Sequence, residues 1–225
     1  MSIKELNIND YYFHSIVRDA KTTFDTVNSI IGNRAILSPK LQHKNVKNGC
    51  HKDNEICLSH ITDNPNSNDY FSCFDIYVNR LISFIIDNQL DKKNVVFKPK
   101  LITTESVFDN IESNNTSTNL YDEYRTNGRI PFKYIKGIAI AYNDIINDPI
   151  KYLTFLDEEY QVCYYNGFLP MKVFEEYKNR HNTEKDKIKR IEFMNDYLYL
   201  LEKEIKKSGV QLPIYYYEDK KLVLK

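Results

Sequence analysis

One histidine stands in an unusual place in this sequence. His14 interrupts the apolar and aromatic run "YYFHSI", which has the composition of a buried strand. An imidazole in such a strand needs a hydrogen-bond partner, because an unpaired polar group costs free energy when it leaves water. The position therefore indicates either a core residue with a hydrogen bond or the first marker of a ligand site.

A second group of reactive side chains lies in the stretch "CHKDNEICLSH". It brings Cys50, His51, Cys57 and His60 close together in the sequence, and zinc accepts thiolate and imidazole ligands. Zinc fingers and ribbons use close ligand pairs that are well separated from each other, and this spacing differs. If "EICLSH" is a strand, Cys57 and His60 also point to opposite faces. We therefore expect no metal site.

Several common nucleotide-binding and hydrolytic motifs are missing from the sequence. A phosphate-binding loop needs closely spaced glycines, whereas Gly32, Gly49, Gly128 and Gly137 are far apart. A serine-hydrolase nucleophile elbow is absent as well. These absences disfavour ordinary ATP, GTP and Rossmann-type NAD binding.

The first part of the chain has the pattern of short strands with few helices. Strands are predicted at "YYFHSI", "AILSP", "EICLSH", "LISFII" and "IKGIAIAY", with a turn at "TNGR". A helix is predicted between the first two strands, with Thr22 or Thr23 at its start and Gly32 at its end. Phe24 and Val27 are on its apolar face. This pattern predicts an α+β fold with a mixed or antiparallel sheet.

After Asn147 the pattern becomes helical. Asp148 and Pro149 form a helix-start signal, and another helix can begin after Pro170. The clearest helix is "EKDKIKRIEFMNDYLYLLEKEIKKSG", which Gly209 closes. Its predicted apolar face consists of Ile188, Ile191, Met194, Leu198, Leu201 and Ile205. We therefore predict a first domain over residues 1–147 and a helical C-terminal extension over 148–225 that packs on the same domain.

The composition sets outer limits on function and location. The 31 basic and 31 acidic side chains cancel, so net charge does not single out nucleic acid or membranes as partners. Four cysteines show no disulfide framework, which favours reduced thiols. With no apparent signal peptide and no stretch approaching the roughly 20 apolar residues of a membrane span, we expect a cytoplasmic protein.

Three segments share their order of elements with one known family. "FHSI" followed by "TFDTVNSIIGNRAILSP" joins a strand carrying histidine to a helix and a second short strand. "EICLSHITDNPNSNDYF" leads from a short strand through a polar loop to a tyrosine, and "DEYRTNGRIPFKYIKGIAI" contains a strand with glutamate and then a hairpin. Over Tyr11 to Ile140 the chain resembles the ADP-ribosyltransferase superfamily of the His-Tyr-Glu type, especially its DNA- and RNA-modifying toxin branch. The resemblance implies a split β-sheet core.

The resemblance also implies a role for each matching residue. Glu123 is the implied catalytic carboxylate, and NAD is the implied substrate, with no metal. His14 is expected to bind a ribose hydroxyl, and Tyr70 is expected to stack on the nicotinamide ring. Ser59 and Asn68 are further candidates for hydrogen bonds to the cofactor.

Several neighbouring residues compete for these roles. Glu105, Glu112 and Asp122 are alternatives to the catalytic glutamate. Tyr77 is the rival of the proposed stacking tyrosine, and His60 competes for the imidazole role.

Two classes of function follow from the resemblance. The first is a mono-ADP-ribosyltransferase that acts on DNA, RNA or protein as an intracellular toxin or phage-defence effector, with an antitoxin or chaperone as candidate partner. Basic groups in "KLQHKNVKNGCHK", together with Arg125 and Arg129, could contact phosphates. The alternative is a non-catalytic module that binds a nucleotide or a partner on the same scaffold. The position of Glu123 relative to His14 and Tyr70 separates the two.

Overall fold

We describe a computed structural model of the chain. The described residues are 5–16, 19–42, 54–60, 81–90, 100–102, 123–157, 159–160, 163, 168–218 and 221–225, with the backbone alone at 60, 100–102, 123–125, 127 and 218.

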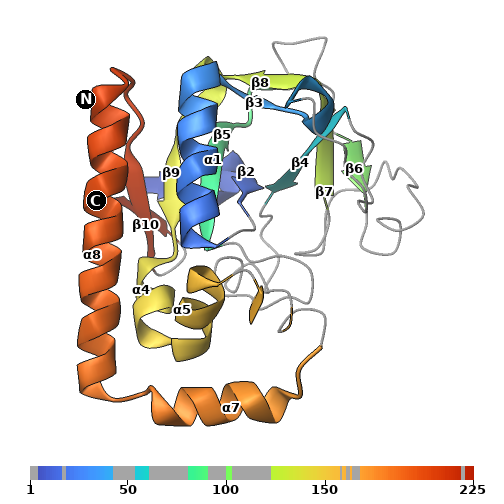
Figure 1. Ribbon diagram of the computed structural model, residues 1–225. Coiled ribbons are helices and arrows are strands. Elements are labelled where there is room, and N and C mark those ends of the chain that lie inside the picture. Colours follow the sequence, from blue (N-terminus) through green and yellow to red (C-terminus); the bar gives the residue numbers. More distant parts are fainter. Residues whose placement is uncertain are drawn as a thin grey trace.

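One mixed sheet forms the centre of the molecule (Figure 1). Within the described ranges it has nine strands in the order β1-β11-β10-β9-β5-β2-β4-β7-β6. Their bounds are β1 (Glu5–Asn7), β2 (Tyr11–Ser15), β4 (Glu55–His60), β5 (Ile82–Asp87), β6 (Lys100–Ile102), β7 (Glu123–Asn127), β9 (Ile135–Ile140), β10 (Ile214–Glu218) and β11 (Lys221–Leu224). The β9–β10 pair is parallel, and the other neighbours are antiparallel.

A second, small sheet pairs two short strands. Strand β3 (Ala35–Leu37) runs antiparallel to β8 (Arg129–Pro131). Short 3-10 turns lie at η1 (Ile8–Asp10), η2 (Pro39–Gln42) and η4 (Phe132–Tyr134). The predicted α+β class with a mixed, mostly antiparallel sheet is therefore confirmed.

Helices cover the sheet on one side and extend beyond it at one end (Figure 1). Helices α1 (Ala20–Asn33) and α8 (Glu184–Lys207) lie beside each other, with the rings of Phe24 and Tyr197 6.2 Å apart. The remaining helices are α4 (Tyr142–Asn147), α5 (Pro149–Leu156) and α7 (Met171–Arg180). Strand β2 and helix α1 contribute to one hydrophobic core, in which Phe13 and Val27 are fully buried.

The ends of α1 differ from the prediction. The side chain of Asp19 caps the helix by accepting hydrogen bonds from the backbone N–H groups of Lys21 and Thr22, so the predicted threonine cap is wrong. The helix also continues through Gly32, and Arg34 takes the left-handed conformation at its C-terminus with φ of 51°.

The predicted starts of the later helices are confirmed. The Asp148 side chain accepts a hydrogen bond from Ile150 N at 2.9 Å, with Pro149 in the first helical turn of α5. Helix α7 follows Pro170 directly.

Helix α8 buries most of its predicted apolar face, with one exception. Met194, Leu198, Leu201 and Ile205 are buried as expected, whereas Ile188 is 53% exposed. Arg190 and Tyr197 are buried on the same helix. The prediction for Ile188 is wrong because the buried side chain at this end of the helix is that of Arg190, which contacts α4 and the end of α7.

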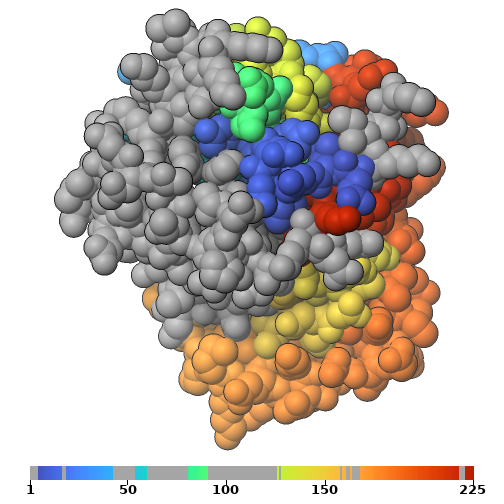
Figure 2. All heavy atoms as spheres, turned by 180° about the vertical axis from the view of Figure 1, so that it is seen from behind, coloured from blue at the N-terminus to red at the C-terminus, as the bar shows by residue number. Residues whose placement is uncertain are grey.

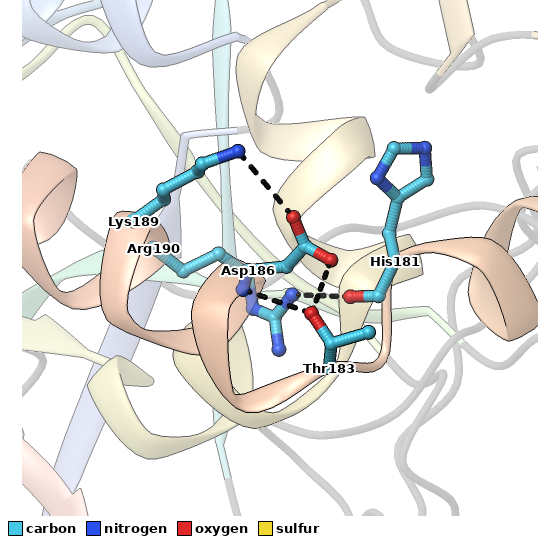
Figure 3. A network of polar contacts seen from close by, with 5 residues as sticks. All are labelled: His181, Thr183, Asp186, Lys189 and Arg190. Carbon is cyan, nitrogen blue, oxygen red and sulfur yellow. Dashed lines mark hydrogen bonds and ion pairs between the residues drawn. The ribbon is translucent and has the colours of Figure 1, made fainter.

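Arg190 connects three helices, and Figure 3 shows its contact with His181. It is 3% exposed, and its Nε donates to the carbonyl of Ile146 at 2.7 Å while Nη1 donates to the carbonyl of His181 at 2.8 Å. These carbonyls lie at the C-terminal ends of α4 and α7, where the helix dipole favours a positive charge. Nearby, Thr183 and Asp186 exchange hydrogen bonds that cap the start of α8.

The C-terminal region is not helical throughout. Strand β10 pairs with β9, and β11 pairs with β1, so the last residues of the chain complete the main sheet. Figure 2 shows the blue N-terminal segment against the red C-terminal one. The prediction of a purely helical extension over 148–225 therefore missed two strands, and the boundary at residue 147 stays a prediction.

Candidate functional site

His14 lies on β2 at the point where its pairing with β4 ends. The β2–β4 register pairs Tyr12 with His60 and Phe13 with Ser59, and β2 continues on its other side along β5, where His14 is opposite Phe84. The side chain of His14 spans from β2 to β4, because its Nδ1 lies 3.0 Å from the carbonyl oxygen of Cys57. The imidazole therefore adds a hydrogen bond between β2 and β4 just past the last paired residues of the two strands.

This contact determines which ring nitrogen of His14 carries a proton. A carbonyl oxygen can only accept, so Nδ1 must be the donor to Cys57. Burial lowers the pKa of His14, although the hydrogen bond to Cys57 opposes the shift. The ring is consequently neutral near pH 7, and Nε2 presents a lone pair. Among the described residues Nε2 has no hydrogen-bond partner.

Strand β4 brings the backbone of β7 near this imidazole. Cys57 pairs with Arg125 and Leu58 pairs with Tyr124, so the same register continued by one residue sets Ser59 opposite Glu123. Two strand spacings, or about 10 Å, separate β2 from β7 in a regular sheet. Position 123 is thus the first residue of β7, and β4 lies between β7 and the strand that carries His14.

The two described hydrogen-bonding candidates do not share a face of the sheet. Ser59 is paired with Phe13, and side chains alternate along a strand, so Ser59 and His14 point to opposite faces if β2 is regular. Ser59 is half-buried. The structure therefore brings these two residues onto neighbouring strands without bringing their side chains together.

Two of the predicted site residues, Tyr70 and Asn68, lie outside the described residues. The competing candidates Tyr77, Glu105, Glu112 and Asp122 lie outside them as well. Of Glu123 and His60 the structure describes the backbone alone. All of the site assignments stay predictions, those of His14 and Ser59 included, although the structure shows where these two residues lie.

Two further searches of the described residues found nothing. No group of three or more His, Cys, Asp or Glu side chains within those ranges could hold a metal ion. No helix in the described part of the chain is long and apolar enough to cross a membrane.

Sequence reasoning missed the backbone partner of His14. The interacting atom is the carbonyl of Cys57, 43 residues away, and any residue type would supply the same carbonyl. Only the pairing of β2 with β4 brings it into reach. The available sequence signal was the apolar strand around the imidazole, which indicates that some partner must exist.

Comparisons with known proteins found a likeness only at the level of structure. No family model and no curated protein matches the chain. Two solved structures are similar to it, the DarT of Thermus sp. 2.9 in complex with NAD+ and the same protein with carba-NAD+. Each has a TM-score of 0.33 and 9% sequence identity, and the match covers 68% of this chain and 97% of the other. A likeness at this level gives no basis for placing a ligand.

Proposed function

We propose that the protein is a mono-ADP-ribosyltransferase, which transfers ADP-ribose from NAD to a macromolecule. The observation that carries the proposal is the state of His14. Strand β2 holds the ring, Nδ1 donates to the Cys57 carbonyl at 3.0 Å, and Nε2, which has no partner among the described residues, can accept a hydrogen bond. The natural partner of such a nitrogen is a hydroxyl group, and a ribose carries two of them next to the bond that reacts.

The proposed chemistry requires a carboxylate near the same sugar. In the transfer, the bond between ribose C1′ and the nicotinamide nitrogen breaks, and neutral nicotinamide leaves. Positive charge develops on the sugar, so a nearby carboxylate stabilises the transition state, as in glycoside cleavage. We assign this role to Glu123, the first residue of β7, from the resemblance. In a regular sheet the register continued to position 123 gives this residue the face of Ser59, opposite to His14, so the assignment requires β7 to depart from regular alternation at its first residue.

The acceptor supplies the new bond to C1′. Its nucleophilic atom attacks as nicotinamide departs, and its proton passes to the carboxylate of Glu123 or to water. Tyr70 is assigned to stack on the nicotinamide ring, while Ser59 and Asn68 remain candidates for binding NAD. A protein with this activity would act as a toxin or phage-defence effector inside the cell, with an antitoxin or chaperone as a candidate partner.

Labelled NAD tests the proposal directly. Purified protein is incubated with NAD labelled in the ADP-ribose part and with separate pools of DNA, RNA and cell protein. Transfer to one pool is expected, and a Glu123→Gln variant should slow it by about 10²- to 10³-fold. Asp122→Asn is the matched control, because it alters the neighbouring carboxylate that could replace Glu123.

Each result has a distinct meaning. Loss of transfer in Asp122→Asn but not in Glu123→Gln would move the catalytic role to Asp122. Binding of NAD without transfer or hydrolysis would favour the alternative function, a non-catalytic nucleotide-binding module. Absence of NAD binding would overturn both.

A further inference from the structure

A groove with a volume of about 370 Å³ lies where α1 begins, α5 ends and α8 passes both helices. Its walls include Phe24 from α1, Leu156 from α5, and Phe193, Tyr197 and Leu200 from α8. The volume is within the range of pockets for small molecules and suits one ring system better than a protein segment.

Aromatic rings form much of this groove. The rings of Phe24 and Tyr197 meet edge to face with centroids 6.2 Å apart, and those of Phe193 and Tyr197 are nearly parallel at 6.4 Å. At the rim, Leu156 and Leu200 are 38% and 50% exposed. An aromatic ring that entered the groove would bury apolar surface and gain ring contacts.

A buried hydroxyl group lies next to the groove. Tyr197 is 7% exposed, and among the described residues its hydroxyl has no hydrogen-bond partner. A buried donor without an acceptor is unfavourable, so a ligand that supplies an acceptor would be stabilised. The hydroxyl itself is shielded from water, so a ligand in the groove reaches it only when the side chains around it move.

The charges around the groove restrict the ligand further. Burial, together with the carboxylate of Asp19, raises the pKa of Tyr197, so the phenol stays a donor. The carboxylate of Asp19 would repel an anion placed next to the Tyr197 hydroxyl. Lys21, in contrast, lines the groove and is exposed. The ligand should thus combine a neutral ring acceptor inside with a negative group outside.

We propose that this groove binds the base of a nucleotide, with the ring against Phe24, Phe193 and Tyr197 and the phosphate near Lys21. A nucleobase is a flat neutral ring with carbonyl or ring-nitrogen acceptors, and its phosphate is a short distance away. Stacking of bases on aromatic side chains is a common mode of nucleic-acid binding. The inference rests on the groove alone and does not depend on the proposed transferase activity.

A single tryptophan can report on binding, because the chain contains none. Leu200→Trp puts the reporter at the rim, where the native side chain is 50% exposed. Tyr199→Trp is the matched control, since Tyr199 is adjacent, 64% exposed and absent from the groove lining. Both variants are titrated with thymidine, adenosine, dTMP, AMP and a short mixed-sequence single strand of DNA.

We expect the emission of Leu200→Trp to change on titration while that of Tyr199→Trp stays constant. Adding Tyr197→Phe to the reporter should weaken binding about tenfold, because only the hydroxyl is removed. Adding Lys21→Met should weaken binding of the nucleotides and leave that of the nucleosides unchanged. Tighter binding of the strand than of dTMP and AMP would identify a nucleic acid as the source of the base, and equal binding would identify a free nucleotide.

Three results would overturn the inference. They are no change in Leu200→Trp with any of these ligands, an equal change in Tyr199→Trp, and an unchanged affinity after Tyr197→Phe. If Leu200→Trp does not fold, equilibrium dialysis of radiolabelled AMP and dTMP against the unmodified chain and its Tyr197→Phe variant decides the question by the same criterion.

Discussion

Two polar side chains in different regions of the molecule are anchored by backbone carbonyls. His14 on β2 donates to Cys57, and Arg190 on α8 donates to Ile146 and His181. The guanidinium joins the ends of two helices to a third, so its contacts serve the assembly of the fold. The imidazole uses one nitrogen for its strand neighbour, and its other nitrogen has no hydrogen-bond partner among the described residues. A buried polar side chain therefore suggests a ligand site when one of its donor or acceptor atoms has no partner in the fold.

Removing the guanidinium should have the largest effect on stability. Arg190→Met leaves two carbonyls at helix ends without their donor, and we expect the free energy of unfolding to fall by about 2–4 kcal/mol. Urea denaturation measures this change. Lys189→Met is the control, because Lys189 is 62% exposed and lies 3.6 Å from Asp186, and it should change the free energy by less than about 0.5 kcal/mol. Equal midpoints for the two variants would show that Arg190 does not hold the helices together.

The junction between the C-terminal strands and the rest of the sheet should be the next most sensitive place. A Cβ atom at Gly137 would lie 2.7 Å from the carbonyl oxygen of Pro213 and 2.8 Å from the Tyr215 ring. Gly137→Ala is therefore expected to destabilise the protein by about 1–3 kcal/mol in thermal or urea unfolding.

A second glycine provides the control for that substitution. Gly32 lies within α1 and has no atom within 4 Å of an added Cβ. Gly32→Ala should leave stability unchanged or raise it by up to about 1 kcal/mol. Destabilisation by both substitutions to the same extent would contradict the close packing of β9 against the C-terminal segment.

The cap at the start of α8 should have a smaller effect than Arg190, although it lies in the same network. The backbone N–H of Asp186 donates to the Thr183 hydroxyl at 3.2 Å. Thr183→Ala removes this acceptor and should lower the free energy of unfolding by about 1 kcal/mol, measured in urea. Thr183→Ser retains the hydroxyl and should behave as the unmodified protein, so a loss in both variants would locate the effect in the methyl group.

The smallest expected effect is the dependence of stability on the protonation of His14. Burial lowers the pKa of this imidazole in the folded state from 6.5, so the unfolded chain binds the proton more readily. As the pH falls below about 6.5, protonation of His14 should favour the unfolded state and lower the free energy of unfolding. Above this pH the imidazole is neutral in both states and does not lower the stability. A His14→Gln variant lacks this titration.

Urea midpoints of the two proteins between pH 5 and pH 8 test the prediction. As the pH falls, the unmodified protein should lose stability relative to the His14→Gln variant. A constant difference over this range would mean that His14 has the same pKa in the folded and unfolded states, and would remove the argument that its ring is neutral because it is buried.

Local patterns predicted most of the elements correctly. The strands at residues 11–15, 55–60, 82–87 and 135–140 were readable because apolar runs ended at turn residues. The start of α5 at Asp148 and Pro149 was readable for the same reason, since a capping side chain and proline act within one turn. The cap of α1 was misassigned because Asp19, Thr22 and Thr23 are all capable of the same hydrogen bond, and the sequence does not rank them.

The long-range features were not readable in this way. Strands β10 and β11 follow a helix and lie beside β9 and β1, which are more than 70 residues away in the sequence. Arg190 looked like an ordinary polar position of α8, because its two partners are carbonyls of other helices. Ile188 fits the apolar stripe of α8 yet is 53% exposed, whereas Arg190 is buried at the same end of the helix.

The sequence by itself determined the α+β class, the element that carries His14 and the residue types available for sugar chemistry, since these depend on composition and local periodicity. The tertiary structure decided the partner of His14, the strand order that places β4 between β2 and β7, and the meeting of Phe24 with Tyr197 in one groove. These features depend on which strands and helices become neighbours. Backbone pairing and packing of distant segments make that choice, and no single stretch of sequence encodes it.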